Sequence, residues 1–308
     1  MLIVDGHAYA YRAFHAIREL RSPAGQPTNA IYGFIKMLAK MRARLSPSHL
    51  IVVWDGGLSA ERMTALPEYK AQRPEMPAEL GSQIDEIIRY LEAANIASFC
   101  REGVEADDYI ACLARRAHNA DMDVVIASSD KDFMQLVLPG IGLLNPNDKT
   151  ETVWTADQVR AKSGVVPSQI VDWLSLLGDS VDNIPGVPGV GPKTAADLLR
   201  QFGSVVALYG RLQEVTSERL RSALTAAAEA VRRNQGLVRL REDLPCEFTP
   251  EEMADQPADA GRLAPLFRQW GFRSLLAELE AAQSRPAFTS LRRGRAEAPS
   301  EGGQAVLL

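Results

Sequence analysis

Short apolar runs in the first half of the chain predict buried strands. Three runs are rich in β-branched residues and occupy residues 2–4, 50–54 and 124–127. Elsewhere, apolar residues return every three or four positions, the period of a helix that buries one face, after Thr28 and over 84–91 and 106–114. This alternation predicts an α/β fold with a mostly parallel sheet flanked by helices.

The second half of the chain shows a different pattern. The strand signal disappears from about Trp154, and helical patterns follow near 169–177, 194–202 and 218–231. We therefore expect an α/β domain over 1–160 and a helical region over 161–282. Residues 283–308 are rich in Arg, Gly, Ser, Pro and Ala, and we expect them to form a flexible tail.

Composition narrows the class of protein. Of 308 residues, 46% are hydrophobic and 24% are charged, which suits a folded globular chain. There is no run of about 18 apolar residues, so we expect no membrane span, and the N-terminus lacks the pattern of a signal peptide. Three cysteines without close spacing indicate neither a disulfide framework nor a zinc site, and a reducing cytoplasm fits them.

Charge is unevenly distributed along the chain. The net charge is −5, but residues 242–260 contain seven acids and no Lys or Arg. The rest of the chain therefore carries a net charge of +2. The total charge thus does not argue against a nucleic-acid partner, and local placement matters more.

Acidic residues follow the predicted strands. Asp5, Asp55 and Asp130 lie at or directly after the three strand ends. The carboxyl ends of parallel strands share one edge of a sheet, and ligands bind in the crevice there. We expect six further acids, which lie close to these strands or in the helical region, to join them: Glu105, Asp107, Asp108, Asp132, Asp179 and Asp182.

Nine carboxylates in one place require cations, because each one would raise the pKa of its neighbours. Mg²⁺ prefers carboxylate oxygens, keeps several waters, and usually binds only one or two protein carboxylates directly. Nine acids therefore suit two Mg²⁺ ions, with Mn²⁺ as a substitute. Two ions about 3.5–4 Å apart can activate a water and stabilise the leaving oxygen of a phosphodiester.

Each group of acids also has a simpler explanation. A single Asp at a strand end is often a turn residue or a helix cap. The acids at 105–108 could complement a helix dipole, and those at 130–132 could be solvated surface. An Asp-x-Asp after a strand also occurs in phosphatases with an aspartate nucleophile, whose chemistry would not need the other seven acids. The predicted convergence of separate strand ends favours the metal site.

The glycine-rich segment 186–194 is close to a nucleotide-binding P-loop. Its glycines have the required separation, but Pro192 is inserted before the Lys-Thr pair and no strand is predicted before the segment. A helix-hairpin-helix near 169–202 is favoured, because its backbone N–H groups and a helix N-terminus can hold a DNA phosphate. A plain helix connection is the third alternative. The residues that would face DNA are Gly186, Gly189, Gly191, Lys193 and Thr194.

Basic residues lie close to two of the acid-bearing strand ends. Arg62, Lys70 and Arg73 come after Asp55, and Arg12 lies on the helix expected after the first strand. A lone Lys or Arg is usually solvated surface. Their position next to the acids favours contact with an anionic strand that enters the metal site.

Six segments together resemble one known family. They begin at residues 5, 69, 103, 129, 178 and 186 and read DGHAYAYRAF, YKAQRP, GVEADD, SDKD, GDSVDN and GVPGVG. In this order and spacing, they resemble the 5′–3′ exonuclease domain of bacterial DNA polymerase I, a relative of flap endonucleases. The resemblance covers roughly residues 1–282.

The resemblance implies a role for each group of residues. Lys70 and Arg73 would stabilise the scissile phosphate from a helical arch, near 60–95, that encloses the single-stranded 5′ end. Arg12 and Tyr69 would contact DNA, and the helix-hairpin-helix would hold the duplex, often with a bound potassium ion. Asp5, Asp55 and Asp107 would line the first metal site with Glu105 and Asp108 close by, and the second would be lined by Asp130, Asp132, Asp179 and Asp182.

The implied activity is that of a structure-specific 5′ nuclease, a phosphodiester hydrolase that acts as exonuclease and flap endonuclease in primer removal and repair. Expected substrates are DNA with a 5′ flap, a nick or an RNA primer, and the expected state is a free-standing monomer. Residues 304–308 could be a clamp-binding peptide or an ordinary apolar end, so a polymerase or sliding-clamp partner stays open. Two rival functions are a DNA-binding protein that does not cut and a P-loop NTPase.

Overall fold

The computed structural model describes residues 1–284 except 149, 151 and 247. Its centre is a six-stranded sheet in the order β3-β2-β1-β4-β5-β6, and every pairing is parallel except that of the edge strand β6. The predicted α/β fold is confirmed. The strands are β1 (Leu2–Asp5), β2 (Leu50–Trp54), β3 (Ala97–Cys100), β4 (Val124–Ala127), β5 (Ile141–Leu144) and β6 (Val153–Trp154).

Helices cover both faces of this sheet, as the continuous apolar strands require. Successive residues of β1 point to opposite faces: Leu2 and Val4 join the apolar cluster on one side, and Ile3 joins the cluster on the other. The first face packs against α1 (Gly6–Ala16), α2 (Asn29–Leu45) and α4 (Ala78–Ala93). The second packs against α5 (Ala106–Asn119) and the 3₁₀ helix η1 (Lys131–Leu136).

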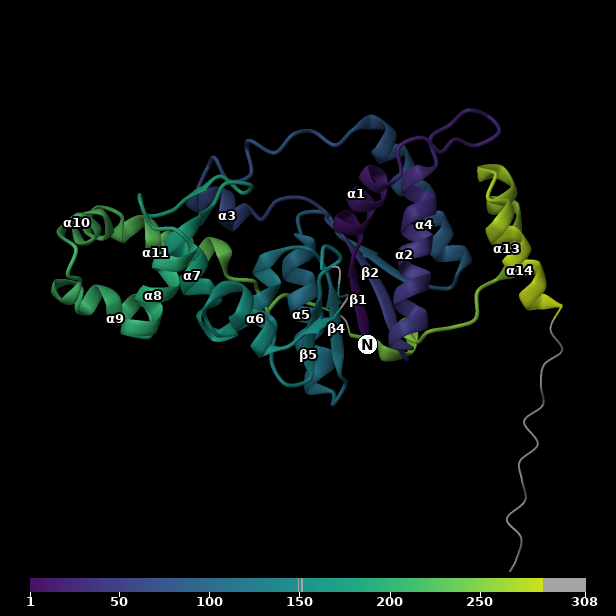
Figure 1. Cartoon of the computed structure of the whole chain (residues 1–308). Coiled ribbons are helices and arrows are strands. Elements are labelled where there is room, and N and C mark those ends of the chain that lie inside the picture. Colours follow the sequence, from purple (N-terminus) through teal and green to yellow (C-terminus); the bar gives the residue numbers. More distant parts are fainter. Residues whose placement is uncertain (149, 151, 247, 285–308) are drawn as a thin grey trace, which may run out of the picture.

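A helical lobe follows the sheet and lies on the left in Figure 1. Its apolar side chains belong to the same cluster as the α5 face of the sheet, so the two lobes share one core. The predicted helix over 218–231 is in fact two helices, separated at Ala227. The elements are α6 (Ala156–Ser163), η2 (Pro167–Gln169), α7 (Ile170–Leu177), β7 (Gly178–Asp179), β8 (Ile184–Pro185), α8 (Pro192–Phe202), α9 (Val205–Gly210), η3 (Leu212–Glu214), α10 (Glu218–Ala226) and α11 (Ala228–Val238).

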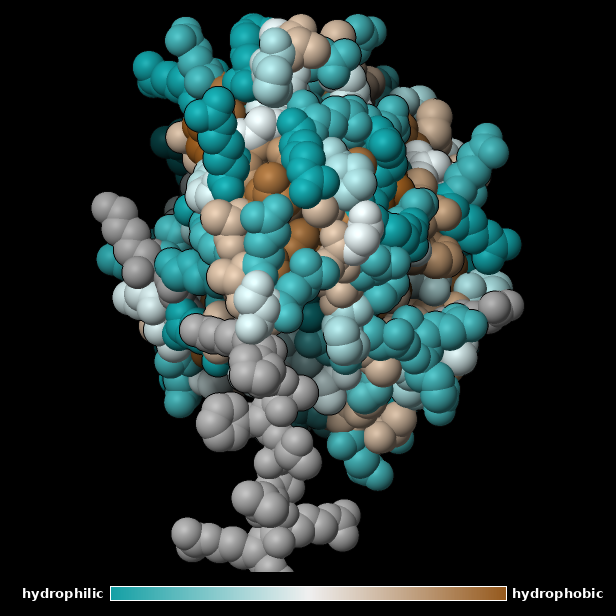
Figure 2. Space-filling view, turned by 90° about the vertical axis from the view of Figure 1, so that its right-hand side faces the viewer, coloured by the Kyte–Doolittle hydropathy of each residue, from teal (hydrophilic) through white to brown (hydrophobic). Residues whose placement is uncertain are grey.

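The last helices return to the sheet lobe. After α12 (Pro250–Met253), α13 (Ala260–Trp270) and α14 (Arg273–Gln283) pack outside α4, on the right in Figure 1. Their apolar residues join the cluster of α1, α2 and α4. The division expected from the sequence placed all of 161–282 in one helical region, whereas these helices extend the first lobe. Figure 2 shows that this end of the molecule is mostly hydrophilic, with small apolar areas between polar side chains.

The segment expected to form a helical arch contains two separate helices. α3 (Ala60–Ala65) is followed by turns over 67–72 and by residues 73–77, which have no regular structure and cross above the sheet lobe in Figure 1. α4 then packs into the core through Leu80, Ile87 and Leu91. Only residues before about 78 therefore cross above the strand ends. None of the helices in the described ranges is long and apolar enough to span a bilayer.

Gln83 on α4 holds three helices in register. The N-cap residue of α2, Thr28, makes no capping bond with its side chain. Instead, Gln83 Oε1 accepts from the Ala30 N–H at 2.7 Å, and its Nε2 donates to Asn29 Oδ1 at 3.0 Å. Asn29 in turn donates to the Phe14 carbonyl at the end of α1. Asp5, one of the acids predicted for the site, is the N-cap of α1, so this network fixes the helix that the acid caps.

We expect Gln83→Ala to lower the free energy of unfolding by about 1–3 kcal/mol, because it leaves a buried N–H without an acceptor. Urea denaturation measures this effect. The matched control is Ser82→Ala, since the exposed Ser82 hydroxyl donates to the Glu79 carbonyl within its own helix. Its effect should stay within about 0.5 kcal/mol. Equal stability of the two variants would show that Gln83 does not cap α2.

Candidate active site

Two strand ends and a serine hold the first part of the site. Asp5 caps α1 by accepting from the Ala8 N–H at 3.0 Å, and its other oxygen accepts from the Ser128 hydroxyl at 2.7 Å. Asp55 follows β2, and its N–H donates to His7 Nδ1 at 3.1 Å. The ends of β1, β2 and β4 therefore meet at one edge, as the sequence predicts.

The 3₁₀ helix η1 supplies the next two acids. Asp130 caps this helix by accepting from the Asp132 N–H at 2.8 Å, and its own N–H donates to the Ser128 hydroxyl at 3.1 Å. The Oδ1 atom of Asp132 is buried, and no described residue hydrogen-bonds to it. Such an orphaned carboxylate oxygen inside a folded protein calls for a ligand such as a water or an ion.

Four of these acids have pKa values raised above those of ordinary aspartates. Burial raises the pKa of Asp5 to about 6, with help from the charges of Asp130 and Asp55. Burial followed by the charges of Asp130 and Asp5 raises the pKa of Asp107 strongly. The pKa values of Asp130 and Asp132 rise through burial and through the acids of the helical lobe, Asp179 and Asp182. Acids of the helical lobe therefore act on the carboxylates of the sheet lobe across the site.

Glu105 and Asp108 are engaged by basic side chains. Asp108 accepts from both terminal nitrogens of Arg62 at 2.7 Å, and Glu105 lies 3.2 Å from the same guanidinium. Glu105 also accepts from Lys70 Nζ at 2.5 Å. Burial alone would raise the pKa of Glu105, but Lys70 and Arg62 outweigh it and hold that pKa below its ordinary value. Asp108, expected near a metal, thus forms a buried ion pair in this structure.

The turn over 67–72 and the residue after it, Arg73, bring two cations to the helical lobe. The Lys70 N–H donates to the Asp182 carbonyl at 3.0 Å, and Arg73 Nη2 lies 2.6 Å from the Asp182 carboxylate. Lys70 has a φ of 56°, in the left-handed region that non-glycine residues rarely adopt. Tyr69, expected to contact DNA, is buried, and its hydroxyl lies 3.1 Å from Glu105 Oε2. The left-handed φ of Lys70 is a backbone strain of the kind that is typical of functional sites.

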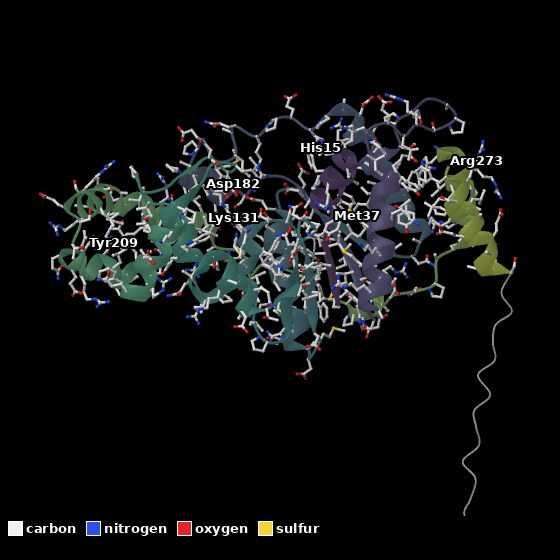
Figure 3. The ribbon with its side chains drawn as sticks, in the orientation of Figure 1. His15, Met37, Lys131, Asp182, Tyr209 and Arg273 are labelled. Atoms are coloured by element: carbon white, nitrogen blue, oxygen red, sulfur yellow. The ribbon has the colours of Figure 1, made fainter. Side chains whose placement is uncertain are left out.

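Lys131 is a site residue that sequence reasoning missed. Its Nζ lies 3.1 Å from Asp179 Oδ2, which joins the two lobes across the site. Figure 3 labels Lys131 and Asp182 where the lobes meet. Sequence reasoning also missed Ser128 and His7. Ser128 donates to Asp5, and His7 accepts from the Asp55 N–H, so both contact acids that the sequence predicts for the site. Arg12, expected to contact phosphate, donates to Asn147 Oδ1.

The helix-hairpin-helix expected near 169–202 corresponds to α7, the short pair β7–β8, a loop and α8. Gly186 packs so closely on the Leu177 carbonyl that a Cβ would lie 1.9 Å from that oxygen, so packing explains this glycine. Gly189 has a φ of 81°, and a Cβ at Gly189 or Gly191 would meet nothing within 4 Å. The side chain of Lys193 is exposed at the start of α8. This open backbone can approach a ligand closely.

The glycine loop does not have the setting of a P-loop. It follows β8, a two-residue strand that pairs antiparallel with β7, and not a strand of the parallel sheet. α8 begins at Pro192, whose missing N–H suits the first turn of a helix. These features favour the helix-hairpin-helix over a nucleotide-binding loop.

The residues of the site fit hard divalent cations. Its free donors are carboxylate oxygens, four of the acids have raised pKa values, and Asp132 Oδ1 lacks a partner. In the part of the chain that the structure describes, no three His, Cys, Asp or Glu side chains come close enough to hold one ion among them. Mg²⁺ suits this spacing, because it binds one or two carboxylates directly and completes its shell with waters.

Solved structures show the same fold. T5 5′-exonuclease with bound zinc ions aligns with a TM-score of 0.65 at 24% identity, over 91% of this chain and 98% of that chain. The catalytic core of Rad2 in complex with DNA substrate aligns with a TM-score of 0.64 at 18% identity, over 92% of each chain. At these identities, the likeness concerns the fold.

Sequence comparison shows the family. A 5′–3′ exonuclease of Aquifex aeolicus is 38% identical over 281 residues, 91% of this chain and 95% of the relative. DNA polymerase I of Bacillus caldotenax is 38% identical over 286 residues, but this chain spans only 33% of that polymerase. The family models for the 5′–3′ exonuclease N-terminal resolvase-like domain and C-terminal SAM fold match residues 1–164 and 165–261. The chain therefore belongs to the 5′–3′ exonuclease family of nucleases.

Proposed function

We propose that this chain hydrolyses phosphodiesters at 5′ ends and 5′ flaps of DNA with two Mg²⁺ ions, for which Mn²⁺ can substitute. The observation that carries this proposal is the meeting of acids from both lobes, with raised pKa values, beside the cations Lys70 and Arg73. Substrates with a 5′ flap, a nick or an RNA primer would suit a role in primer removal and repair.

The acids divide between two ions. Asp5, Asp55 and Asp107 would hold the first with Glu105 nearby, and Asp130, Asp132, Asp179 and Asp182 would hold the second. We leave Asp108 out of this set, because Arg62 occupies both of its oxygens. When bound, such ions activate a water and stabilise the charge that develops on the leaving oxygen.

Lys70 and Arg73 would stabilise the scissile phosphate. Arg73 is the more accessible of the two, with 38% of its side chain exposed against 2% for Lys70. Both cations now lie against acids, so a phosphate would compete with Asp182 for the guanidinium and with Glu105 for the ammonium. A planar guanidinium is suited to binding two phosphate oxygens at once.

The helix-hairpin-helix would hold the duplex part of the substrate. The loop at Gly189 and Gly191 leaves room for a phosphate, and Lys193 and Thr194 stand at the N-terminus of α8. A potassium ion at this loop, which the family resemblance implies, would add positive charge for the phosphate. Contacts of this kind do not read sequence. Arg12 is a further candidate for phosphate contact because it is exposed.

A DNA-binding protein that does not cut is the second candidate function. Nothing in the site favours it, since the acids with raised pKa values serve no purpose in binding an anion. A polymerase or clamp partner is a proposal that rests on residues 304–308, which lie outside the described residues. The predicted flexible tail lies there too, apart from residues 283 and 284.

Cleavage of a labelled 5′-flap duplex tests the proposed function directly. We expect no products in EDTA and recovery on adding excess Mg²⁺ or Mn²⁺, because the bound cations would activate the attacking water and stabilise the leaving oxygen. Gel-resolved product lengths would report exonuclease and endonuclease cuts separately. Cleavage that persists at full rate in EDTA would refute the two-metal mechanism.

The neighbouring acids Asp107 and Asp108 should behave in opposite ways. Asp107→Asn should abolish both cleavage and the thermal stabilisation by Ca²⁺, while the metal-free protein keeps its stability. Asp108→Asn should lower the free energy of unfolding by roughly 3–5 kcal/mol, because it breaks a buried ion pair, yet keep the response to Ca²⁺. Each variant controls for the other. A stable Asp108→Asn protein that Ca²⁺ no longer stabilises would show that Asp108 belongs to the metal site.

Lys70→Ala and Arg73→Ala should each slow single-turnover cleavage by about 10²–10³, the typical cost of one lost transition-state donor. Quench-flow measurement with saturating enzyme separates this rate from binding. Arg89→Ala is a suitable control, because Arg89 pairs with Glu86 on the same exposed helix face. Rates within a few-fold of the control would mean that neither cation contacts the reacting phosphate.

A further inference from the structure

A cavity of about 1100 Å³ lies where α3 and α11 meet, at the junction of the two lobes. Figure 1 shows these two helices close together beside the sheet lobe. The cavity lies between α3, α11 and the segment 239–243. Its volume is close to the upper end of the range of roughly 300–1,000 Å³ that is usual for small-molecule pockets, so it has room for an extended ligand. We call it the arginine groove, after its arginines Arg62, Arg115, Arg232, Arg233, Arg239 and Arg241.

Half of these arginines are neutralised by acids. Arg62 pairs with Asp108, Arg115 pairs with Glu242 at 2.7 Å, and Arg241 lies 3.1 Å from Glu61. These pairs also engage two of the three acids of the groove lining; the third, Asp243, lies 3.4 Å from Arg241. The paired half of the groove therefore carries little free charge.

The other half carries uncompensated positive charge. Within the described ranges, no ion pair or side-chain hydrogen bond engages Arg232, Arg233 or Arg239. The Nε atom of Arg233 is buried and has no hydrogen-bond partner among the residues that the structure describes. A buried N–H donor without a partner is rare in folded proteins and points to a bound acceptor. The unsatisfied donor and three unpaired guanidinium groups together indicate an anion.

The groove adjoins the proposed active site. Arg62 lines the groove and also pairs with Glu105 and Asp108. Gln135 lines it from η1, where its Nε2 donates to the carbonyls of Asp132 and Val238. The groove therefore lies next to the acids and shares Arg62 with them.

We propose that the arginine groove binds phosphate groups of single-stranded nucleic acid beside the active site. Guanidinium groups recognise phosphate by paired hydrogen bonds and need no particular base. Several arginines along an open groove suit successive phosphates of one strand. That the phosphate belongs to a nucleic-acid strand is an inference that rests on the proposed function. That the groove recognises phosphate does not depend on that function.

Charge-matched triple variants test the groove. Binding of a fluorescent 12-residue oligo(dT) is measured by anisotropy in EDTA, where metal-dependent cleavage cannot occur. Arg232→Gln with Arg233→Gln and Arg239→Gln should weaken binding at least tenfold and reduce the slope of log K against log salt by about 2, since each phosphate contact on a single strand contributes about 0.7. The control combines Arg18→Gln, Arg219→Gln and Arg273→Gln, three exposed arginines outside the groove. Equal affinities of the two triple variants would overturn the proposal.

Gly236 offers a second variant that keeps every arginine. It lines the groove on α11, and a Cβ there would meet nothing within 4 Å, so a side chain fits without a clash. Gly236→Glu places a negative charge on the groove, and Gly236→Gln is its neutral match of the same shape. We expect the Glu variant to bind oligo(dT) at least tenfold more weakly than the Gln variant. Identical affinities would count against a phosphate site.

Inorganic phosphate distinguishes the two sources of the ligand, with its affinity measured by calorimetry. If the groove triple variant loses affinity for oligo(dT) alone, the groove serves nucleic acid. If the triple variant loses affinity for both probes, the groove also binds free phosphate. If it keeps its affinity for both, the proposed site is overturned. Because binding is measured in EDTA, a wild-type protein that fails to cut flaps in Mg²⁺ would refute the proposed function without affecting this result.

Discussion

The crowding of negative charge at one edge of the sheet is the constraint on which the site depends. Parallel strands bring Asp5 and Asp130 to the same edge, and the second lobe adds Asp179 and Asp182. Among the described residues, three cations compensate part of this cluster: Lys70 on Glu105, Arg73 on Asp182 and Lys131 on Asp179. Asp132 keeps a raised pKa and, within that part of the chain, an oxygen without a partner. This uneven compensation leaves negative charge for cations to neutralise.

The same ion pairs join the two lobes. The turn that carries Lys70 docks on the loop of Asp182 through a backbone hydrogen bond, and Asn183 donates to the Glu68 carbonyl from the other side. These contacts hold Lys70 in a left-handed conformation, which costs of order 1–3 kcal/mol for a residue other than glycine. The shared apolar core beneath them keeps the lobes fixed. Cations and acids can therefore meet without a large movement of either lobe.

Much of the sheet could be predicted, because three central strands are short runs of β-branched residues. β3 and β5 lack this signal: β3 has partly exposed side chains and includes Ser98, and β5 contains Gly142. The return of α13 and α14 to the first lobe could not be predicted either. Their helical period is clear, but an apolar face does not reveal which of two apolar surfaces it will cover. The break at Ala227 has no Gly or Pro to mark it.

For the site, residue types and strand ends were sufficient to find the acids, but not to assign each one. Asp107 and Asp108 are adjacent on a helix, so their side chains point about 100° apart and only one can face the cluster. The partner that decides between them, Arg62, is 46 residues away in sequence and donates to both oxygens of Asp108. Tyr69 and Lys70 were expected on an accessible arch, yet both are buried against Glu105. Such assignments depend on long-range packing that a sequence pattern does not contain.

One buried cation has consequences on two sides of the molecule. The guanidinium of Arg62 spans Asp108 and Glu105 and donates to the carbonyls of Leu237 and Arg239. The pair with Arg62 fixes Glu105 beside Lys70 in the active site. The hydrogen bonds from Arg62 to the two carbonyls fix the backbone that carries Arg239 in the arginine groove. Removing one member of such a buried set leaves an uncompensated charge, so it resists rearrangement. The position of the acids and the position of the groove are therefore set by the same ion pairs, so the attachment of α3 fixes how the groove lies relative to the acids.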